Sequence, residues 1–317
     1  EIASCLVGSE MCIRDSSTYA TYVVMSFMML VMIFMMLPAA QVSAERINEV
    51  LERDVNIKEG SVSEGREQGT VEFKNVSFRY PHASEDELSN ISFKINKGQT
   101  LAIIGATGSG KTTLISLIPR FYDATDGEVL VDGVDVKEYP FSQLRGMIGI
   151  VPQKAVLFKG TIRHNMQWRD KNATDEDIWN ALDIAQAKDF VEKKPDKLDE
   201  MILQEGKNLS GGQRQRLTIA RALVGDPEIL ILDDSASALD LATDARLRKA
   251  IHEKTSGMTV FIVSQRISSI KSADKIIVLD DGKIAGIGTH SELYNGCEVY
   301  KEICLSQLSE KEAQANG

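Results

Sequence analysis

Residues 105–112 read Gly-Ala-Thr-Gly-Ser-Gly-Lys-Thr, which is a glycine-rich loop of the pattern G-x-x-x-x-G-K-[ST]. The apolar run at residues 101–104 predicts a buried strand before the loop, and the residues from Thr113 onward predict a helix after it. Glycines let the backbone N–H groups of such a loop point inward, and the helix N-terminus adds partial positive charge. The strand–loop–helix context argues against a chance Gly-rich turn, so we expect ATP or GTP as a ligand.

Two side chains of this loop have defined chemistry. Lys111 can reach the β- and γ-phosphates of a nucleotide, and the Thr112 hydroxyl can ligate Mg²⁺. The residues that we expect to bind the nucleotide through this loop are Thr107, Gly108, Ser109, Gly110, Lys111, Thr112 and Thr113.

Composition narrows the function classes. A chain of 317 residues predicts about two domains. A net charge of −10 disfavours wrapping around nucleic acid, and 6% aromatic residues disfavour stacking on single strands. The four cysteines show no C-x-x-C spacing and the four histidines are scattered, so a disulfide framework or a zinc site is not expected.

A long uncharged stretch lies near the N-terminus. Residues 16–44 contain no charged side chain, and residues 19–37 are apolar or weakly polar. A helix of that length crosses the hydrocarbon core of a bilayer, so residues 16–53 predict a transmembrane helix with a cytosolic extension. A buried core helix is the alternative. A signal peptide fits poorly because the apolar run is too long and no basic region precedes it.

Residues 1–15 show no clear periodicity and resemble a translated sequencing adapter, so we expect them to be non-native and the chain to be a fragment. Residues 54–68 are polar and rich in Gly, Ser and Glu, which predicts a linker. Residues 306–317 predict a polar tail that frays.

Alternating strands and helices between residues 69 and 305 predict an α/β core with a mostly parallel sheet. The predicted strands are 71–80, 90–96, two short ones within 128–136, 148–151, 229–232, 259–263 and 275–279, and the clearest predicted helices are 175–191 and 213–223.

Further motifs, taken in chain order, resemble those of ATP-binding-cassette (ABC) proteins. Tyr80 matches the aromatic that stacks on adenine, and Gln153 matches the Q-loop. Asp233, after an apolar strand, matches the Walker B motif, and Asp240 closes a D-loop at residues 235–240. The signature motif is matched by Leu209, Ser210, Gly211, Gly212 and Gln213.

The resemblance covers about residues 16–300 and implies a P-loop NTPase cassette with a mixed sheet, an antiparallel β subdomain and a helical subdomain, preceded by one transmembrane helix. It implies the C-terminal part of an exporter half-transporter in the cell membrane, multi-pass when complete, with its nucleotide-binding domain in the cytoplasm. ATP and Mg²⁺ are the implied cofactors, with Thr112, Gln153 and Asp233 around the metal. The signature would complete the ATP site of a partner subunit, and the substrate is a small molecule, lipid or peptide that the sequence does not name.

Two positions depart from the family pattern. Active members carry Glu after the Walker B aspartate, to position the attacking water, but here the residue is Asp234. The switch loop usually carries His, but here it carries Gln265, which cannot become positively charged. Aspartate is shorter by one C–C bond of about 1.5 Å, and displacements of ~1 Å at a reacting centre cost on the order of 10²-fold.

An intact signature beside an altered base resembles the weakly hydrolysing subunit of a heterodimeric exporter, which is our interpretation. A homodimeric exporter with slow turnover and a non-catalytic ATP-gated module stay open as alternatives. A DNA-associated ATPase of the SMC type shares the signature and Walker motifs, but the apolar helix and the net charge of −10 argue against it.

Overall fold

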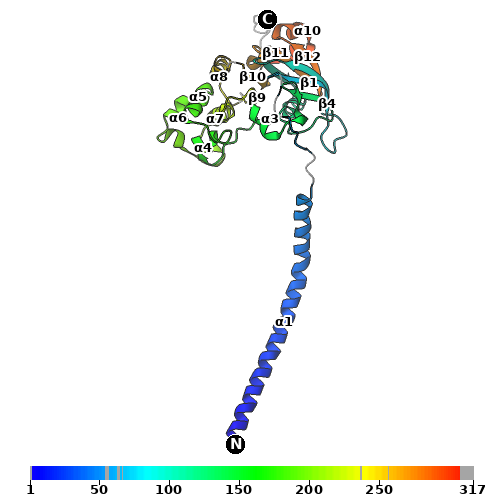
Figure 1. Ribbon diagram of the computed structural model, residues 1–317, viewed down its shortest axis with the longest axis vertical. Coiled ribbons are helices and arrows are strands. Elements are labelled where there is room, and N and C mark those ends of the chain that lie inside the picture. The colour runs from blue at the N-terminus through cyan, green and yellow to red at the C-terminus, as the bar shows by residue number, and fades with distance from the viewer. Residues whose placement is uncertain are drawn as a thin grey trace. The chain divides into compact units, whose positions relative to one another are not determined.

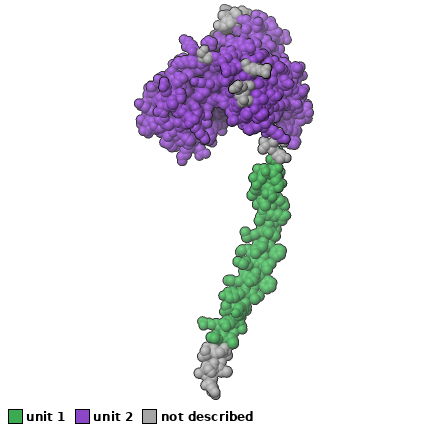
Figure 2. All heavy atoms as spheres, in the orientation of Figure 1, with its two compact units in different colours: residues 1–56 green, residues 57–317 purple. Residues whose placement is uncertain are grey.

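The computed structural model describes residues 2–53, 57–62, 65, 67–235, 238–255 and 257–307 (Figure 1). The chain divides into two units, residues 1–56 and residues 57–317, which Figure 2 colours separately. Parts of the predicted linker and D-loop, and residues 308–317 of the predicted tail, lie outside the described residues.

The first unit is built on one helix, α1 (Ile2–Leu51), which is 50 residues long and contains Pro38. Its described side chains from Met11 onward are exposed, and the stretch Met11–Leu51 is long and apolar enough to cross a membrane by length and composition. The predicted apolar helix is therefore present. It also runs through most of residues 1–15, which show no clear periodicity. That this segment is non-native stays a prediction.

The second unit contains a mixed sheet. Among the described residues this sheet has six strands in the order β12-β11-β3-β10-β9-β6, and all neighbours are parallel except β11 and β12. Its strands are β3 (Thr100–Gly105), β6 (Ile148–Val151), β9 (Ile229–Asp233), β10 (Thr259–Val263), β11 (Lys275–Asp280) and β12 (Lys283–Gly288). Strands β9 and β10 are buried along their whole length, as central parallel strands covered on both faces are.

Alternate residues of the central strands face two different cores. Leu101 and Ile103 of β3 belong to one buried apolar cluster, whereas Ala102 and Ile104 belong to the other. Because side chains alternate across a strand, this division places one apolar core on each face of the sheet.

Antiparallel strands form smaller sheets. One has the order β2-β1-β4-β5, and a second pairs β7 with β8. These strands are β1 (Val71–Phe78), β2 (Leu88–Ile95), β4 (Asp126–Val131), β5 (Val134–Asp135), β7 (Gly160–Thr161) and β8 (Met201–Ile202). The alternation predicted for residues 71–80 is present in β1 on either side of Lys74 and Asn75, which are two consecutive exposed residues where the pairing register shifts, and the strand ends at Phe78.

The helices of this unit are α2 (Lys111–Leu117), α3 (Phe141–Met147), α4 (Ile162–Met166), α5 (Asp175–Ile184), α6 (Lys188–Glu192), α7 (Gly211–Leu223), α8 (Leu241–Lys254), α9 (Ile267–Ile270), α10 (His290–Gly296) and α11 (Glu298–Gln307). Helix α11 continues through Gln307, two residues into the segment predicted as a tail.

The predicted helix at residues 175–191 is wrong as a single element. It breaks into α5 and α6 at Gln186, whose φ is +56°, and the Ala187 N–H donates to the Leu182 carbonyl at 2.7 Å. The apolar spacing continues across the break because both helices pack on the same core, and no Gly or Pro marks it. Strand β12 and the β7–β8 pair were not predicted, because two-residue strands and a half-exposed edge strand leave little pattern.

Candidate nucleotide site

The phosphate loop joins the end of β3 to the start of α2, as the sequence predicts. Gly108 and Gly110 have φ values of +84° and +89°, which favour glycine. A Cβ at Gly105 would lie 2.1 Å from the Leu279 carbonyl oxygen, whereas a Cβ at Gly108 would meet nothing within 4 Å. The loop therefore packs closely at its base and is open over Gly108.

Lys111 is buried and its ammonium contacts the loop itself. Its Nζ donates to the carbonyl of Ala106 at 2.6 Å and to that of Gly105 at 3.0 Å, with Ser109 Oγ at 3.3 Å. Burial lowers the pKa of Lys111 from its ordinary value, and the nearby carboxylates of Asp233 and Asp234 oppose that shift. The positive charge thus lies over the loop, ready for an anion that offers stronger acceptors than neutral carbonyls.

Asp233 is the last residue of β9 and faces the first turn of α2. Thr112 Oγ1 lies 3.1 and 3.3 Å from the two carboxylate oxygens of Asp233 and donates to them. Burial raises the pKa of Asp233, while the Thr112 hydrogen bond opposes the rise. A hydroxyl and a carboxylate from elements far apart in the chain therefore converge on one point.

Asp234 follows in the left-handed region, with φ of +42°, a conformation that aspartate tolerates better than most residues. Its N–H donates to the Val263 carbonyl at 2.9 Å, and Gln153 Nε2 lies 3.5 Å from its Oδ2. Burial raises the pKa of Asp234, and the Gln153 contact opposes this. These bonds hold the carboxyl between the ends of β6, β9 and β10.

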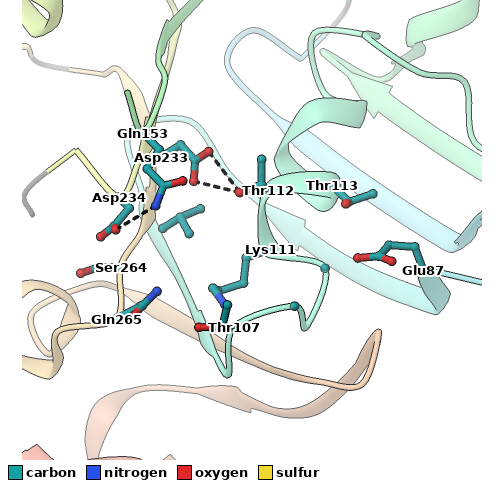
Figure 3. Close-up of a pocket in the computed structure, with 13 residues that line it drawn as sticks. Glu87, Thr107, Lys111, Thr112, Thr113, Gln153, Asp233, Asp234, Ser264 and Gln265 are labelled. Atoms are coloured by element: carbon teal, nitrogen blue, oxygen red, sulfur yellow. Dashed lines mark hydrogen bonds between the residues drawn. The ribbon is translucent and has the colours of Figure 1, made fainter. Parts of the chain in front are cut away.

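These groups line one cavity of about 180 Å³ at the carboxyl ends of the parallel strands, where open α/β sheets bind ligands (Figure 3). Of the residues predicted from the sequence, it is lined by Thr107, Gly108, Gly110, Lys111, Thr112, Thr113, Gln153, Asp233, Asp234 and Gln265. Glu87, Val263 and Ser264 also line it and were missed. Glu87 comes just before β2, outside any motif, so no sequence signal marked it.

Tyr80 is not among the lining residues of this cavity. Its hydroxyl lies 3.0 Å from Thr113 Oγ1, and its ring meets Phe78 and Tyr122 edge-on at 4.8 and 5.3 Å between centroids. Tyr80 is thus held beside the loop by packing and by a direct hydrogen bond with Thr113, which lines the cavity.

The signature residues Leu209–Gln213 lie at and just before the start of α7, and none of them lines this cavity. Ser210 is its N-cap and forms a capping box with Gln213, in which the Gln213 N–H donates to Ser210 Oγ at 3.3 Å and Gln213 Oε1 accepts from the Ser210 N–H at 3.1 Å. A neighbouring hollow of about 360 Å³ is lined by both Gln153 and Gly211. Asp240 is the N-cap of α8 and accepts from the Thr243 N–H at 2.9 Å.

The oxygen groups suit a hard cation. No cluster of three or more His, Cys, Asp or Glu side chains that could hold a metal by themselves occurs in the described part of the chain. Thr112 and Asp233 supply two converging oxygen ligands, and Mg²⁺ is typically bound by one or two protein oxygens together with phosphates and water. The residues present therefore fit Mg²⁺ that arrives with a nucleotide.

Comparison with known proteins identifies the cassette. Residues 88–237, which include the phosphate loop, Asp233 and the signature, match the family described as ABC transporter. The chain carries an ABC transporter ATP-binding domain.

Relatives of this ABC domain extend the match over the N-terminal helix. The chain is 42% identical over 309 residues to an uncharacterized ABC transporter ATP-binding protein, YfiB, of Bacillus subtilis, covering 98% of this chain and 53% of that protein. It is 40% identical over 276 residues to an ATP-dependent lipid A-core flippase of Hahella chejuensis, covering 87% and 46%. The chain thus spans about half the length of these relatives.

A solved structure agrees with this ABC fold. The structure of a bacterial Atm1-family ABC exporter with ATP bound superimposes with a TM-score of 0.80 at 32% sequence identity, covering 89% of this chain and 50% of that one. The predicted ABC cassette with a long apolar helix before it is confirmed, and the chain is homologous to ABC exporters.

Proposed function

We propose that this chain is the ATP-binding subunit of an ABC exporter, with α1 as the last membrane helix and the cassette in the cytoplasm. The observation that carries the proposal is the cavity in which Lys111, Thr112, Gln153 and Asp233 converge from α2, the loop after β6 and the end of β9. The exporter homology and the length and apolar composition of α1 support the membrane part.

ATP would lie with its phosphates over the loop from Thr107 to Thr113. Lys111 exchanges its bonds to loop carbonyls for phosphate oxygens, because a charge-assisted bond to an anion is stronger than one to a neutral carbonyl. Thr112 and Asp233 would hold Mg²⁺, with Gln153 close enough to join its water shell. When bound, Mg²⁺ neutralises charge that develops on the phosphates.

We propose that this site binds ATP well but hydrolyses it slowly. The Asp234 carboxyl is tied to Gln153 at 3.5 Å and is one methylene shorter than the glutamate that the family uses. Gln265 lines the same cavity and can hydrogen-bond a phosphate without carrying charge. Asp234 shortens the reach to the attacking water, and Gln265 removes a charge from one phosphate contact, whereas the phosphate loop from Thr107 to Thr113 keeps its residue types.

The partner would be a second half-transporter, whose phosphate loop faces Ser210 and the N-terminus of α7. The capping box uses the N–H groups of Ser210 and Gln213, so the N–H groups of Gly211 and Gly212 in the first turn of α7 stay available to a phosphate. We propose a heterodimer in which the partner's site hydrolyses ATP and this chain's site mainly holds it. The exported substrate is a small molecule, lipid or peptide.

The test measures ATP binding and self-association together. We expect the detergent-solubilised chain to bind labelled ATP in a Mg²⁺-dependent manner. We also expect it to stay monomeric by light scattering, because the proposed dimer needs a second, different half-transporter. An ATP-dependent dimer of the chain with itself would favour the homodimeric alternative. Absence of ATP binding would refute the proposed function.

A further inference from the structure

We propose that Gln307, at the end of helix α11, is a positioning residue for Gln265 in the nucleotide cavity. This inference rests on the proposed function of that cavity. Gln307 Nε2 donates to the backbone carbonyl of Gln265 at 2.6 Å, and Gln307 Oε1 accepts from the Ile267 N–H at 3.0 Å. One side-chain amide therefore holds the backbone on both sides of Arg266.

The segment that Gln307 holds, residues 264–267, forms part of one wall of the nucleotide cavity. Ser264 and Gln265 line the cavity, and Figure 3 shows them across it from Glu87. The Ser264 N–H donates to the Ile103 carbonyl at 3.3 Å, which fixes the β10 side of the segment. On the other side, Gln307 supplies a second attachment, and it comes from a helix that contributes no lining residue.

Helix α11 is firmly seated, which makes Gln307 a fixed reference point. Tyr300 and Cys304 are both 0% exposed and lie in the apolar cluster that also contains Ala102 and Ile104 of β3. The Tyr300 hydroxyl lies 2.8 Å from His290 Nδ1. Tyr300, Cys304 and Gln307 follow helical spacing of four and three, which puts all three on one face. The burial of α11 thus sets the position of the Gln307 amide over the segment.

The chemical consequence concerns orientation. A side chain aids a reacting centre only when its backbone is held in place, since errors of ~1 Å at such a centre cost on the order of 10²-fold in rate. With Gln307 in place, the backbone that carries the Gln265 side chain is held at the edge of the cavity that this side chain lines. Without it, the carbonyl of Gln265 and the N–H of Ile267 turn to water, and the segment samples other conformations.

The experiment uses the heterodimer whose other site is disabled by changing its catalytic Glu to Gln, and compares this chain in that complex with three variants. Gln307→Ala removes both hydrogen bonds, and Gln307→Glu keeps the acceptor for Ile267 but removes the donor to Gln265. Ser306→Ala is the matched control, because within the described residues its hydroxyl bonds to the Ile303 carbonyl of its own helix, at 2.8 Å. Each is measured by ATP affinity, by single-turnover release of labelled phosphate and by amide hydrogen exchange of peptides that cover residues 264–270.

We expect Gln307→Ala to lower the single-turnover rate about fivefold to tenfold, the equivalent of one lost hydrogen bond in the transition state. ATP affinity should change less than about twofold, because the phosphate loop is untouched. Exchange at residues 264–270 should rise in Gln307→Ala, rise less in Gln307→Glu and stay unchanged in Ser306→Ala.

Repeating Gln307→Ala in a chain that also carries Gln265→Ala distinguishes a positioning role of Gln307 from a purely structural one. If Gln307 acts through Gln265, then Gln307→Ala lowers the rate no further in that background. An equal loss with and without the Gln265 side chain would overturn the inference, as would exchange and rate equal to wild type. Failure of the proposed function is distinct from this, since it shows as a wild-type chain that does not bind ATP.

Discussion

The nucleotide cavity has two walls that differ in how closely they follow the family pattern. The loop wall, residues 105–113, carries every residue type that phosphate binding needs, and Lys111 is already buried over it. The strand-end wall is formed by Asp233, Asp234, Ser264 and Gln265. It keeps the carboxylate that we propose for the metal, and it differs at Asp234 and Gln265 from the residues that the family resemblance implies. In the proposed function, nucleotide binding and water activation therefore depend on separate elements of the fold, so that one can change while the other is kept.

The loop wall makes the largest prediction. Lys111→Ala removes the side-chain cation aimed at the phosphates, and we expect ATP affinity to fall by about 10- to 100-fold, as for the loss of a charged hydrogen bond. Titration with labelled ATP measures this, and circular dichroism checks that the fold is retained. Lys97→Ala, at an exposed lysine outside the cavity, is the control. Equal affinity of wild type and Lys111→Ala would contradict the site assignment.

The strand-end wall makes the opposite prediction, a gain. Asp234→Glu together with Gln265→His should raise hydrolysis at this site by on the order of tenfold or more, because reach to the water and a chargeable phosphate contact both return. Asp234→Glu alone should give part of the gain, although glutamate accepts the φ of +42° less readily than aspartate. The two effects should not add, since both touch one transition state.

The measurement is ATP turnover in a heterodimer whose other site is disabled by changing its catalytic Glu to Gln. If the double variant is no faster than wild type, the slow turnover has another origin, and the distinction between the two walls fails.

A third prediction tests whether the signature motif of each subunit completes the nucleotide site of the other. Ser210→Ala should reduce hydrolysis by the assembled pair by about tenfold, while ATP binding to this chain's own loop stays nearly unchanged. Loss of the N-cap also costs roughly 1 kcal/mol of stability. Thr174→Ala removes a similar capping box from α5 and controls for that cost. A defect confined to this chain's own ATP affinity would contradict the head-to-tail geometry.

Tyr80 tests how far the loop wall extends toward the base. Tyr80→Ala should weaken ATP binding by about fivefold, near the lower end of the ~1–3 kcal/mol measured for base stacking on aromatic rings. Tyr80→Trp should not weaken it, and Tyr80→Phe isolates the hydroxyl contact with Thr113. If Ala and Trp weaken binding alike, the tyrosine serves packing with Phe78 and Tyr122.

The smallest effect concerns a carboxyl pair outside both walls. Burial, with the charge of Glu228 beside it, raises the pKa of Asp132 from 3.8 to about 6. Within the described part of the chain, no donor group satisfies the buried Asp132 Oδ1 or Glu228 Oε2. A raised acid pKa means that its contribution to stability is complete below pH 3.8 and is lost as pH rises through about 6.

Asp132→Asn should therefore stabilise the cassette above pH 6 by roughly 1 kcal/mol, because the neutral amide removes the cost of ionisation and tolerates the φ of +55°. Urea unfolding at pH 5 and pH 8 measures this. A variant that is no more stable than wild type at pH 8, or equally stabilised at both pH values, would show that Asp132 is not the group that titrates.

The sequence alone determined the elements whose signals are local. The loop at residues 105–112 needs glycine where φ is positive, and the all-apolar runs of β9 and β10 need burial on both faces, so composition over a few residues predicts both. The order of motifs then indicated that Gln153, Asp233 and Gln265 share a site, and the cavity contains all three.

Only the tertiary structure decided which residues outside the sequence motifs contact the nucleotide cavity or one another. Glu87 lines the cavity because the β1–β2 turn reaches Gly110, where an added Cβ would lie 3.1 Å from the Glu87 carbonyl oxygen. Gln307 reaches the backbone of Gln265 because Tyr300 and Cys304 pack α11 on the apolar core. Asp132, in the turn between β4 and β5, lies close enough to Glu228 for the two carboxyls to interact. Such contacts join segments far apart in the chain and depend on packing distances of a few ångström, which no periodicity in the sequence records.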